Sequence, residues 1–210
     1  MRFLTLLAIL FSTATALHAQ LGPDVAVFQI QFGRDKALQQ VVIGLYDSAT
    51  PATVDNFKTL IAEKYYNGMR FHRVFPNSMV QTGDPLSKRG PDDRSGTGGP
   101  GYTVPAEIRK PHARGSVAMS RISGPSNPAK ASSGSQFYVC LQPLPKLNGQ
   151  YTVFGEVLQG LDVLEKISNA RTDTNDFPVD KIVIRKVTLE PRGVFEAAPA
   201  PAAPLPQTPN

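Results

Sequence analysis

The segments GSVAMSR (residues 115–121) and SSGSQFYVC (132–140) carry the pattern that decides the fold. Each is a short apolar run into which Ser, Arg or Gln is set. The connection between them, ISGPSNPAKA (122–131), is rich in Pro, Gly and Ser, which is typical of a loop. Strands joined by loops favour an antiparallel sheet over an architecture of alternating strands and helices.

The polar residues of the second segment fall on one face. In a strand, successive side chains point to opposite sides, so Phe137 and Val139 share a face that is apolar and predicts core. Gln136, Tyr138 and Cys140 share the other face, which combines an amide, a phenol and a thiol. This second face is either solvated or lines a binding groove, and the alternation alone leaves both interpretations open.

Similar strand-like runs recur along the chain. They occupy residues 25–33, 37–46, 69–76, 79–85, 102–108, 115–121, 136–142, 151–158 and 181–190. Apolar residues at helical spacing predict one helix from Pro51 up to Gly68 and a second over residues 158–170. Seven to nine strands and two helices, joined mostly by turns, predict a mainly β fold. We expect a closed antiparallel β-barrel whose openings are capped by the two α-helices.

Composition limits the function classes. The 210 residues, 41% of them hydrophobic, suffice for one domain with a core. The net charge of +5 is spread along the chain, so we expect no nucleic-acid partner. The single cysteine and three scattered histidines offer no clustered ligands, so no metal site and no cofactor are expected. A hydrolase is disfavoured because the chain has no G-x-S-x-G motif.

The two ends of the chain differ from its middle. Residues 1–19 combine Arg2 with a short apolar run and small-residue cleavage candidates at 14–16 and 17–19, which predicts a secretory signal peptide. The apolar run is too short to span a bilayer, so no stable membrane anchoring is expected after cleavage. The protein would then be periplasmic or secreted. Residues 20–190 would form the domain, and the Pro/Ala-rich residues 191–210 a disordered tail.

The stretch FHRVFPNSMVQTGDP (71–85) holds the most informative charged residue. In a strand, Arg73 shares a face with Phe71 and Phe75. Such an arginine either lays its stem on apolar surface with its head in water, or holds its guanidinium at the rim of an apolar pocket, aimed at a carbonyl or amide. The spacing alone does not choose between the two.

Taken together, five segments resemble the cyclophilin-type peptidyl-prolyl cis-trans isomerases in order and spacing. They are FHRVFPNSMVQTGDP, GTGGPGYTVPAE, GSVAMSR, SSGSQFYV and LNGQYTVFGEVLQGLDVLEKI, and the similarity covers about residues 25–190. The resemblance implies an eight-stranded antiparallel barrel with two helices and an active groove on its outer surface. It also implies that the protein accelerates X–Pro rotation in proline-containing polypeptides. With the predicted signal peptide, we expect it to assist the folding of exported polypeptides, as a monomer.

The resemblance assigns site residues position by position. The family's catalytic arginine falls on Arg73, and Gln81 would orient it. The implied substrate-binding residues are Met79, Ser120, Arg121, Gln136, Tyr138, Leu147 and Tyr151. Two departures stand out: Ser78 replaces a phenylalanine common in the family, which predicts a shallower proline pocket, and Tyr138 replaces a phenylalanine. Ser78, together with Lys146 in place of a tryptophan found in some members, supports one alternative, a proline-peptide-binding or chaperone-like module with weak or no catalysis.

Overall fold

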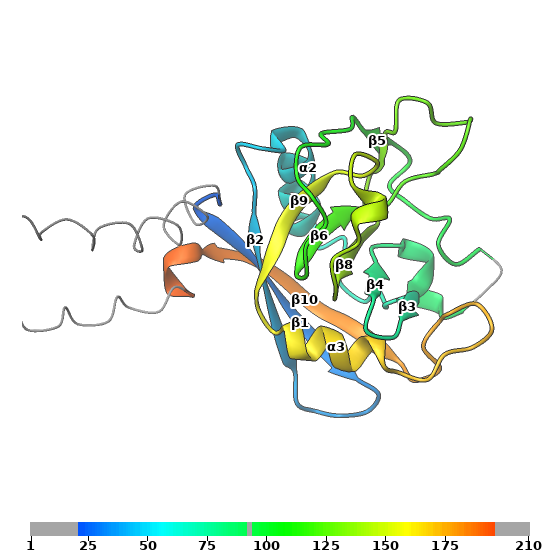
Figure 1. Cartoon of the computed structure of the whole chain (residues 1–210). Coiled ribbons are helices and arrows are strands. Elements are labelled where there is room, and N and C mark those ends of the chain that lie inside the picture. The colour runs from blue at the N-terminus through cyan, green and yellow to red at the C-terminus, as the bar shows by residue number, and fades with distance from the viewer. Residues whose placement is uncertain (1–20, 92–93, 196–210) are drawn as a thin grey trace, which may run out of the picture.

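In the computed structural model, which describes residues 21–91 and 94–195, a curled antiparallel sheet forms the body of the domain (Figure 1). Its eight strands follow the order β10-β1-β2-β9-β6-β8-β4-β3. They are β1 (Asp24–Phe32), β2 (Gln39–Leu45), β3 (Arg73–Phe75), β4 (Met79–Thr82), β6 (Ser116–Met119), β8 (Phe137–Cys140), β9 (Val153–Gln159) and β10 (Ile182–Pro191). A separate two-stranded sheet pairs β5 (Thr103–Val104) with β7 (Ser132–Ser133). The prediction of a mainly β, antiparallel fold is confirmed.

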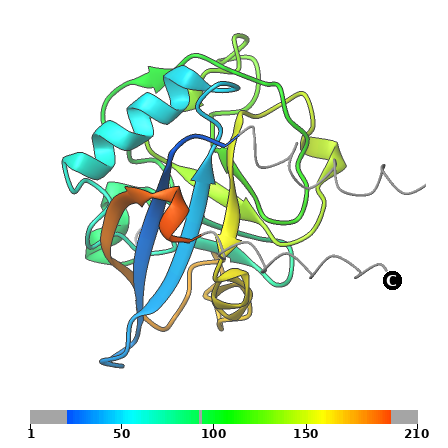
Figure 2. The same cartoon turned by 90° about the vertical axis from the view of Figure 1, so that its left-hand side faces the viewer.

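Two helices lie at opposite ends of the curled sheet (Figures 1 and 2). Helix α2 (Pro51–Ala62) begins with proline at its first turn, and α3 (Leu161–Ser168) follows Gly160. The apolar stripe of α2 places Phe57 among aromatic rings of the sheet, with centroids 4.9 Å from Phe154 and 5.5 Å from Phe137. Burying a side chain of this size stabilises the fold by roughly 1.5–3 kcal/mol.

The edges of the sheet approach one another. Among the described residues the strand ladder ends at β10 on one side and at β3 on the other. The chain just before β3 contacts β10: Gly68 N–H donates to the Ile184 carbonyl at 2.8 Å, and Ile184 N–H to the Met69 carbonyl at 2.8 Å. A bridge between Arg70 and Val183 follows. The sheet is therefore strongly curled, whereas full closure of the barrel stays a prediction.

Several boundaries differ from the sequence prediction. Helix α2 ends at Ala62 rather than at Gly68, because Lys64 adopts a left-handed conformation (φ 57°) and starts a series of turns. Only Arg73–Phe75 of the expected strand 69–76 pairs with β4.

The ordered chain also continues past residue 190, since Arg192 N–H donates to the Pro23 carbonyl at 2.7 Å and a short 3₁₀ turn spans Arg192–Val194. The predicted signal peptide and most of the predicted tail lie outside the described residues. Within residues 21–91 and 94–195, no helix is long and apolar enough to cross a membrane.

Candidate active site

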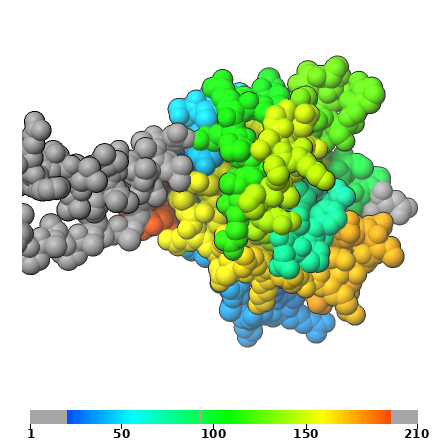
Figure 3. All heavy atoms as spheres, viewed as in Figure 1, coloured from blue at the N-terminus to red at the C-terminus, as the bar shows by residue number. Residues whose placement is uncertain are grey.

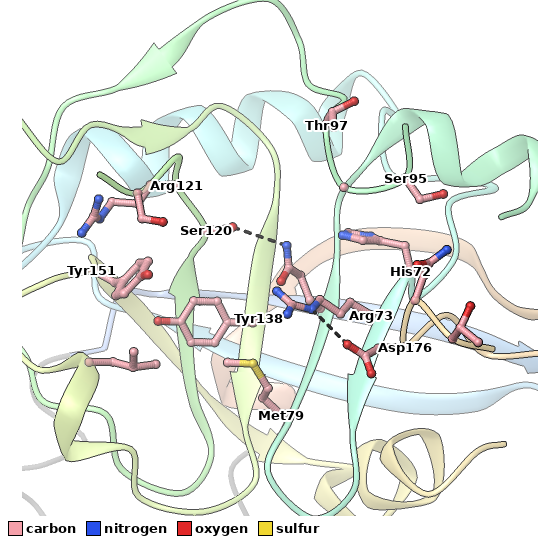
Figure 4. Close-up of a pocket in the computed structure, with 16 residues that line it drawn as sticks. His72, Arg73, Met79, Ser95, Thr97, Ser120, Arg121, Tyr138, Tyr151 and Asp176 are labelled. Carbon is pink, nitrogen blue, oxygen red and sulfur yellow. Dashed lines mark hydrogen bonds and ion pairs between the residues drawn. The ribbon is translucent and has the colours of Figure 1, made fainter. Parts of the chain in front are cut away.

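A cavity of about 850 Å³ opens on the outer face of the sheet, where β3, β4 and β8 meet two loops (Figure 4). Every site residue predicted from the sequence lines it except Gln136, which borders an adjoining groove of about 980 Å³. The lining residues are His72, Arg73, Met79, Gln81, Ser95, Gly96, Thr97, Ser120, Arg121, Ser123, Tyr138, Leu147, Tyr151, Thr174, Asn175 and Asp176. The fold therefore brings residues from all five segments that resemble the family into one cavity.

Arg73 lies at the rim of this cavity. It stands on β3 opposite Gln81 of β4. Its guanidinium carbon is 4.7 Å from the centroid of the Phe75 ring, and its Nε is 3.6 Å from Oδ2 of Asp176. The side chain remains 51% exposed. The second interpretation of the sequence therefore applies, because the guanidinium lies beside the Phe75 ring at the rim of an open cavity.

Gln81 links three parts of the cavity wall. Its side-chain amide donates to the Ser120 hydroxyl at 3.4 Å and to Oε1 of Gln136 at 3.0 Å. Gln136 in turn donates to the carbonyls of Gly96 and Gly98 at 2.8 and 2.7 Å. These bonds fix the glycine-rich loop to the sheet, while the orienting effect of Gln81 on Arg73 stays a prediction.

The side-chain hydroxyl of Ser120, not its backbone, contacts the Gln81 side chain. Its N–H donates to the Gln136 carbonyl at 2.9 Å, and its own carbonyl accepts from Ser133 N–H at 2.7 Å. Both backbone groups therefore have protein partners. The hydroxyl, which an alanine would lack, accepts from the Gln81 amide.

Tyr138 forms the buried floor of the cavity. The residue is 3% exposed, and its hydroxyl shares a hydrogen bond with Nε2 of His112 at 2.9 Å. Nδ1 of His112 lies 3.1 Å from Oδ1 of Asn148. Burial, aided by the neighbouring Cys140 and Tyr151, raises the pKa of Tyr138, and burial lowers the pKa of His112 against the opposing Asn148 hydrogen bond. Tyrosine and histidine are thus both neutral at pH 7, and the phenol hydroxyl is engaged with the His112 ring.

The far end of the cavity holds a second, more constrained arginine. Arg121 donates from Nε to the Gln150 carbonyl at 2.8 Å and from Nη1 to the Ile122 carbonyl at 3.1 Å. Its guanidinium carbon lies 4.8 Å from the centroid of the Tyr151 ring. The Tyr151 ring meets that of Tyr138 nearly at right angles, with centroids 5.8 Å apart. Arg121 therefore braces an aromatic wall.

Ser78 lies in the turn between β3 and β4, outside the set of lining residues. Its N–H donates to the Phe75 carbonyl at 3.0 Å, and its carbonyl accepts from Leu141 N–H at 2.8 Å. The apolar side chains that do line the cavity include Met79 and Leu147. The expected effect of Ser78 on the depth of the proline pocket stays a prediction.

Sequence reasoning missed the wall formed by residues 174–176, which no motif marks, and the support given by His112 from beneath. It also gave no role to His72, which lines the cavity. His72 is 3% exposed, and its burial lowers its pKa to about 4, a shift that the Asp84 carboxylate opposes and Arg73 aids. Neutral histidine is therefore the form present at pH 7.

The chemistry available in the cavity is hydrogen-bond donation beside apolar walls. Cys140 is buried below the surface, and burial raises its pKa to about 12, so it is a packed thiol rather than a nucleophile. Within residues 21–91 and 94–195 no three His, Cys, Asp or Glu side chains gather as metal ligands would. The Arg73 guanidinium lies at a cavity lined by the Tyr138 ring and by the apolar side chains Met79 and Leu147. A hydrogen-bond donor beside apolar surface suits a neutral amide ligand.

Comparison with known proteins agrees with this geometry. Residues 27–189 match the family described as cyclophilin type peptidyl-prolyl cis-trans isomerase/CLD. The chain is similar to peptidyl-prolyl cis-trans isomerase D of Saccharomyces cerevisiae, with 36% identity over 87% of this chain and 81% of the yeast protein. It is also similar to peptidyl-prolyl cis-trans isomerase B of Bacillus subtilis, with 41% identity over 60% of this chain and 80% of that protein.

A solved structure gives the same result. The crystal structure of a Cryptosporidium parvum cyclophilin type peptidyl-prolyl cis-trans isomerase, determined in the presence of the dipeptide Ala-Pro, superposes with a TM-score of 0.67. Its sequence is 27% identical, and the match covers 79% of this chain and 98% of the other. The curled sheet, the two helices and the matched sequence together show that this chain belongs to the cyclophilin-type peptidyl-prolyl cis-trans isomerases.

Proposed function

We propose that this isomerase acts on proline-containing polypeptides in the Arg73 cavity, with the guanidinium as the group that lowers the rotation barrier. The observation that carries the proposal is the position of Arg73 at the rim of a hollow whose floor is the Tyr138 ring. The related Cryptosporidium parvum protein was crystallised in the presence of Ala-Pro, which supports a proline-containing ligand. The family and its named relatives favour catalysis over a binding module without it.

Electrostatic stabilisation of the transition state can supply a large part of the required rate enhancement. Uncatalysed X–Pro interconversion takes about 10–100 s at 25 °C. Shortening it to a millisecond takes four to five decades, which corresponds to roughly 6–7 kcal/mol of transition-state stabilisation. When the amide twists, the prolyl nitrogen becomes pyramidal and its lone pair localises. A hydrogen bond donated to that nitrogen is strong only in the twisted state, so it accelerates rotation rather than merely binding substrate.

The other lining residues would hold the substrate on either side of the twisting bond. Met79, Tyr138 and Leu147 would contact the proline ring, which suits their apolar surfaces. The remaining substrate contacts fall to Ser120, Arg121, Gln136 and Tyr151. Rotation would then occur about a bond with the substrate's proline ring held by packing on one side. The rest of the peptide would be held by hydrogen bonds on the other side.

The direct test combines a rate measurement with a map of binding. NMR exchange on an Ala-Pro-containing peptide should show accelerated cis/trans exchange in the presence of the purified protein. The same peptide should shift the amide resonances of β4 and β8. Binding without faster exchange would support the peptide-binding alternative, and shifts confined to β1 and β10 would place the ligand elsewhere.

We further propose that the protein works outside the cytoplasm, as a periplasmic or secreted monomer that assists folding of exported chains. Support comes from the signal-peptide pattern of residues 1–19. Mass spectrometry of the exported protein should find an N-terminus after Ala16 or Ala19, and an uncleaved chain retained in the cytoplasm would contradict the proposal. Light scattering should give the mass of one chain.

The hydrogen bonds from residues 68 and 69 to Ile184 support a further proposal, that the curled sheet behaves as a closed barrel. Hydrogen exchange tests it. The amide proton of Ile184 should then be protected as strongly as those within the β1–β10 ladder, and rapid exchange at Ile184 would indicate an open edge.

A further inference from the structure

We propose that Asp176 is a positioning residue for Arg73, holding the guanidinium in the orientation in which it meets the twisting amide. The inference rests on the catalytic role proposed above for Arg73. Asp176 belongs to the loop between α3 and β10, a segment that no sequence motif marked, and it lines the same cavity as Arg73. Figure 4 shows the two side chains pointing toward one another from different elements, joined by the ion pair.

The contact involves the inner nitrogen of the guanidinium. Oδ2 of Asp176 is 3.6 Å from Nε of Arg73, and the Phe75 ring lies against the guanidinium with its centroid 4.7 Å from Cζ. A carboxylate at Nε and a ring against the plane together restrict rotation of the head group. The planar fork of arginine is then presented toward the cavity with its two outer nitrogens as donors.

The loop is built to hold that carboxylate in place. The Asp176 carbonyl accepts from Val74 N–H at 3.0 Å, which fastens the loop to the residue beside Arg73. Phe177 is 1% exposed and anchors the loop in the core. Oδ1 of Asp173 accepts from Asn175 N–H and Phe177 N–H at 2.8 and 3.0 Å. In Figure 3 this loop, coloured orange, lies beside the teal β3–β4 segment.

A counter-ion has two opposing effects on a catalytic cation, and the geometry indicates which one dominates. A short charge-assisted hydrogen bond would occupy a donor and weaken the positive field. The separation of 3.6 Å exceeds the usual hydrogen-bond range of about 2.7–3.2 Å, and both side chains are roughly half exposed, so water screens the pair. Orientation is therefore gained with little loss of charge, and removing the carboxylate should slow the reaction.

The test replaces the carboxylate without disturbing the loop. Asp176 has φ 62°, a left-handed conformation that asparagine also adopts readily, so Asp176→Asn keeps the backbone. We expect kcat to fall about two- to fivefold, the range that exposed ion pairs support, while KM changes less than twofold. The matched control is Asp173→Asn. It removes the same charge from the same loop but retains an oxygen that accepts the two backbone hydrogen bonds, and it should match the parent.

A spectroscopic readout separates positioning from loop stability. The Arg73 Nε–H resonance should be resolved in the parent and in Asp173→Asn, and should broaden or exchange faster with solvent in Asp176→Asn. Unchanged or higher kcat in Asp176→Asn, or an equal loss in both variants, would overturn the inference. Arg73→Ala distinguishes a failure of the positioning role of Asp176 from a failure of the catalytic role proposed for Arg73. An inactive Arg73→Ala beside a fully active Asp176→Asn defeats only the positioning role, whereas an active Arg73→Ala defeats both.

Discussion

Single residues explain how the cavity acquires its floor. The alternation of residues 136–140 places Tyr138 on the face opposite Phe137 and Val139, which is either solvated or lines a groove, and in the structure Tyr138 lines the cavity. The partner of its hydroxyl could not be predicted, because His112 is 26 residues away and belongs to no motif that implies a contact. The pairing of a buried phenol with a buried imidazole is set by tertiary packing, which residue periodicity does not encode.

Replacing Tyr138 tests that pairing. Tyr138→Phe leaves the ring but removes the hydroxyl, so a nitrogen of buried His112 loses its partner. We expect the free energy of unfolding in urea to fall by about 1–3 kcal/mol. The control is Tyr102→Phe, which removes a hydroxyl bonded to Asn56 on a residue 49% exposed, and it should change stability much less. Equal effects at the two positions would contradict the account.

Elements position the site through their spacing. Strand β4 and the start of β8 approach closely, which lets the Gln81 amide reach Gln136. Alternation and turn residues predicted most of these strands, since register follows from which side chains are apolar. The wall formed by residues 174–176 was beyond prediction, because its shape depends on long-range hydrogen bonds such as that from Val74 to Asp176.

Gly83 tests the close approach of the chain just after β4 to the chain just before β8. Its φ of 88° is left-handed, and a Cβ there would lie 2.2 Å from the Ser135 carbonyl oxygen. Backbone cannot yield as a flexible side chain does, so Gly83→Ala should destabilise the fold by at least about 2 kcal/mol in thermal or urea unfolding.

Gly99→Ala is the matched control, because a Cβ at Gly99 meets no atom within 4 Å. It should unfold within roughly 0.5 kcal/mol of the parent. A Gly83→Ala variant as stable as Gly99→Ala would mean that Gly83 and Ser135 are not in close contact.

At the scale of the whole molecule, the fold class was predictable, whereas the individual contacts between the chain before β3 and strand β10 were not. Strand count and turn spacing indicate a mainly β fold, and the matched segments indicate the family. The bonds from residues 68 and 69 to β10 join parts of the chain more than 100 residues apart and follow a helix that ends earlier than its periodicity predicted. Such contacts arise from packing of the whole domain.

Stability of the whole domain should depend on pH through His72. Its pKa is about 4 in the folded protein against 6.5 ordinarily, so between these values the unfolded chain binds the proton more readily. The contribution is fully present above pH 6.5 and is lost as the pH falls toward 4, by up to ~3 kcal/mol. Because burial of His112 acts in the same direction, the measurement compares parent with His72→Gln between pH 7 and pH 4.5. Identical pH slopes for the two proteins would contradict the prediction.

The central claim is that the Arg73 guanidinium stabilises the twisted amide, and NMR exchange rates of a single X–Pro peptide test it most directly. With purified Arg73→Ala and Arg73→Lys beside the parent, we expect kcat/KM to fall about 100- to 1000-fold for alanine, the loss typical of one transition-state donor. Lysine should restore little, because it lacks the planar fork. A folded Arg73→Ala protein that accelerates exchange as fast as the parent would contradict the account.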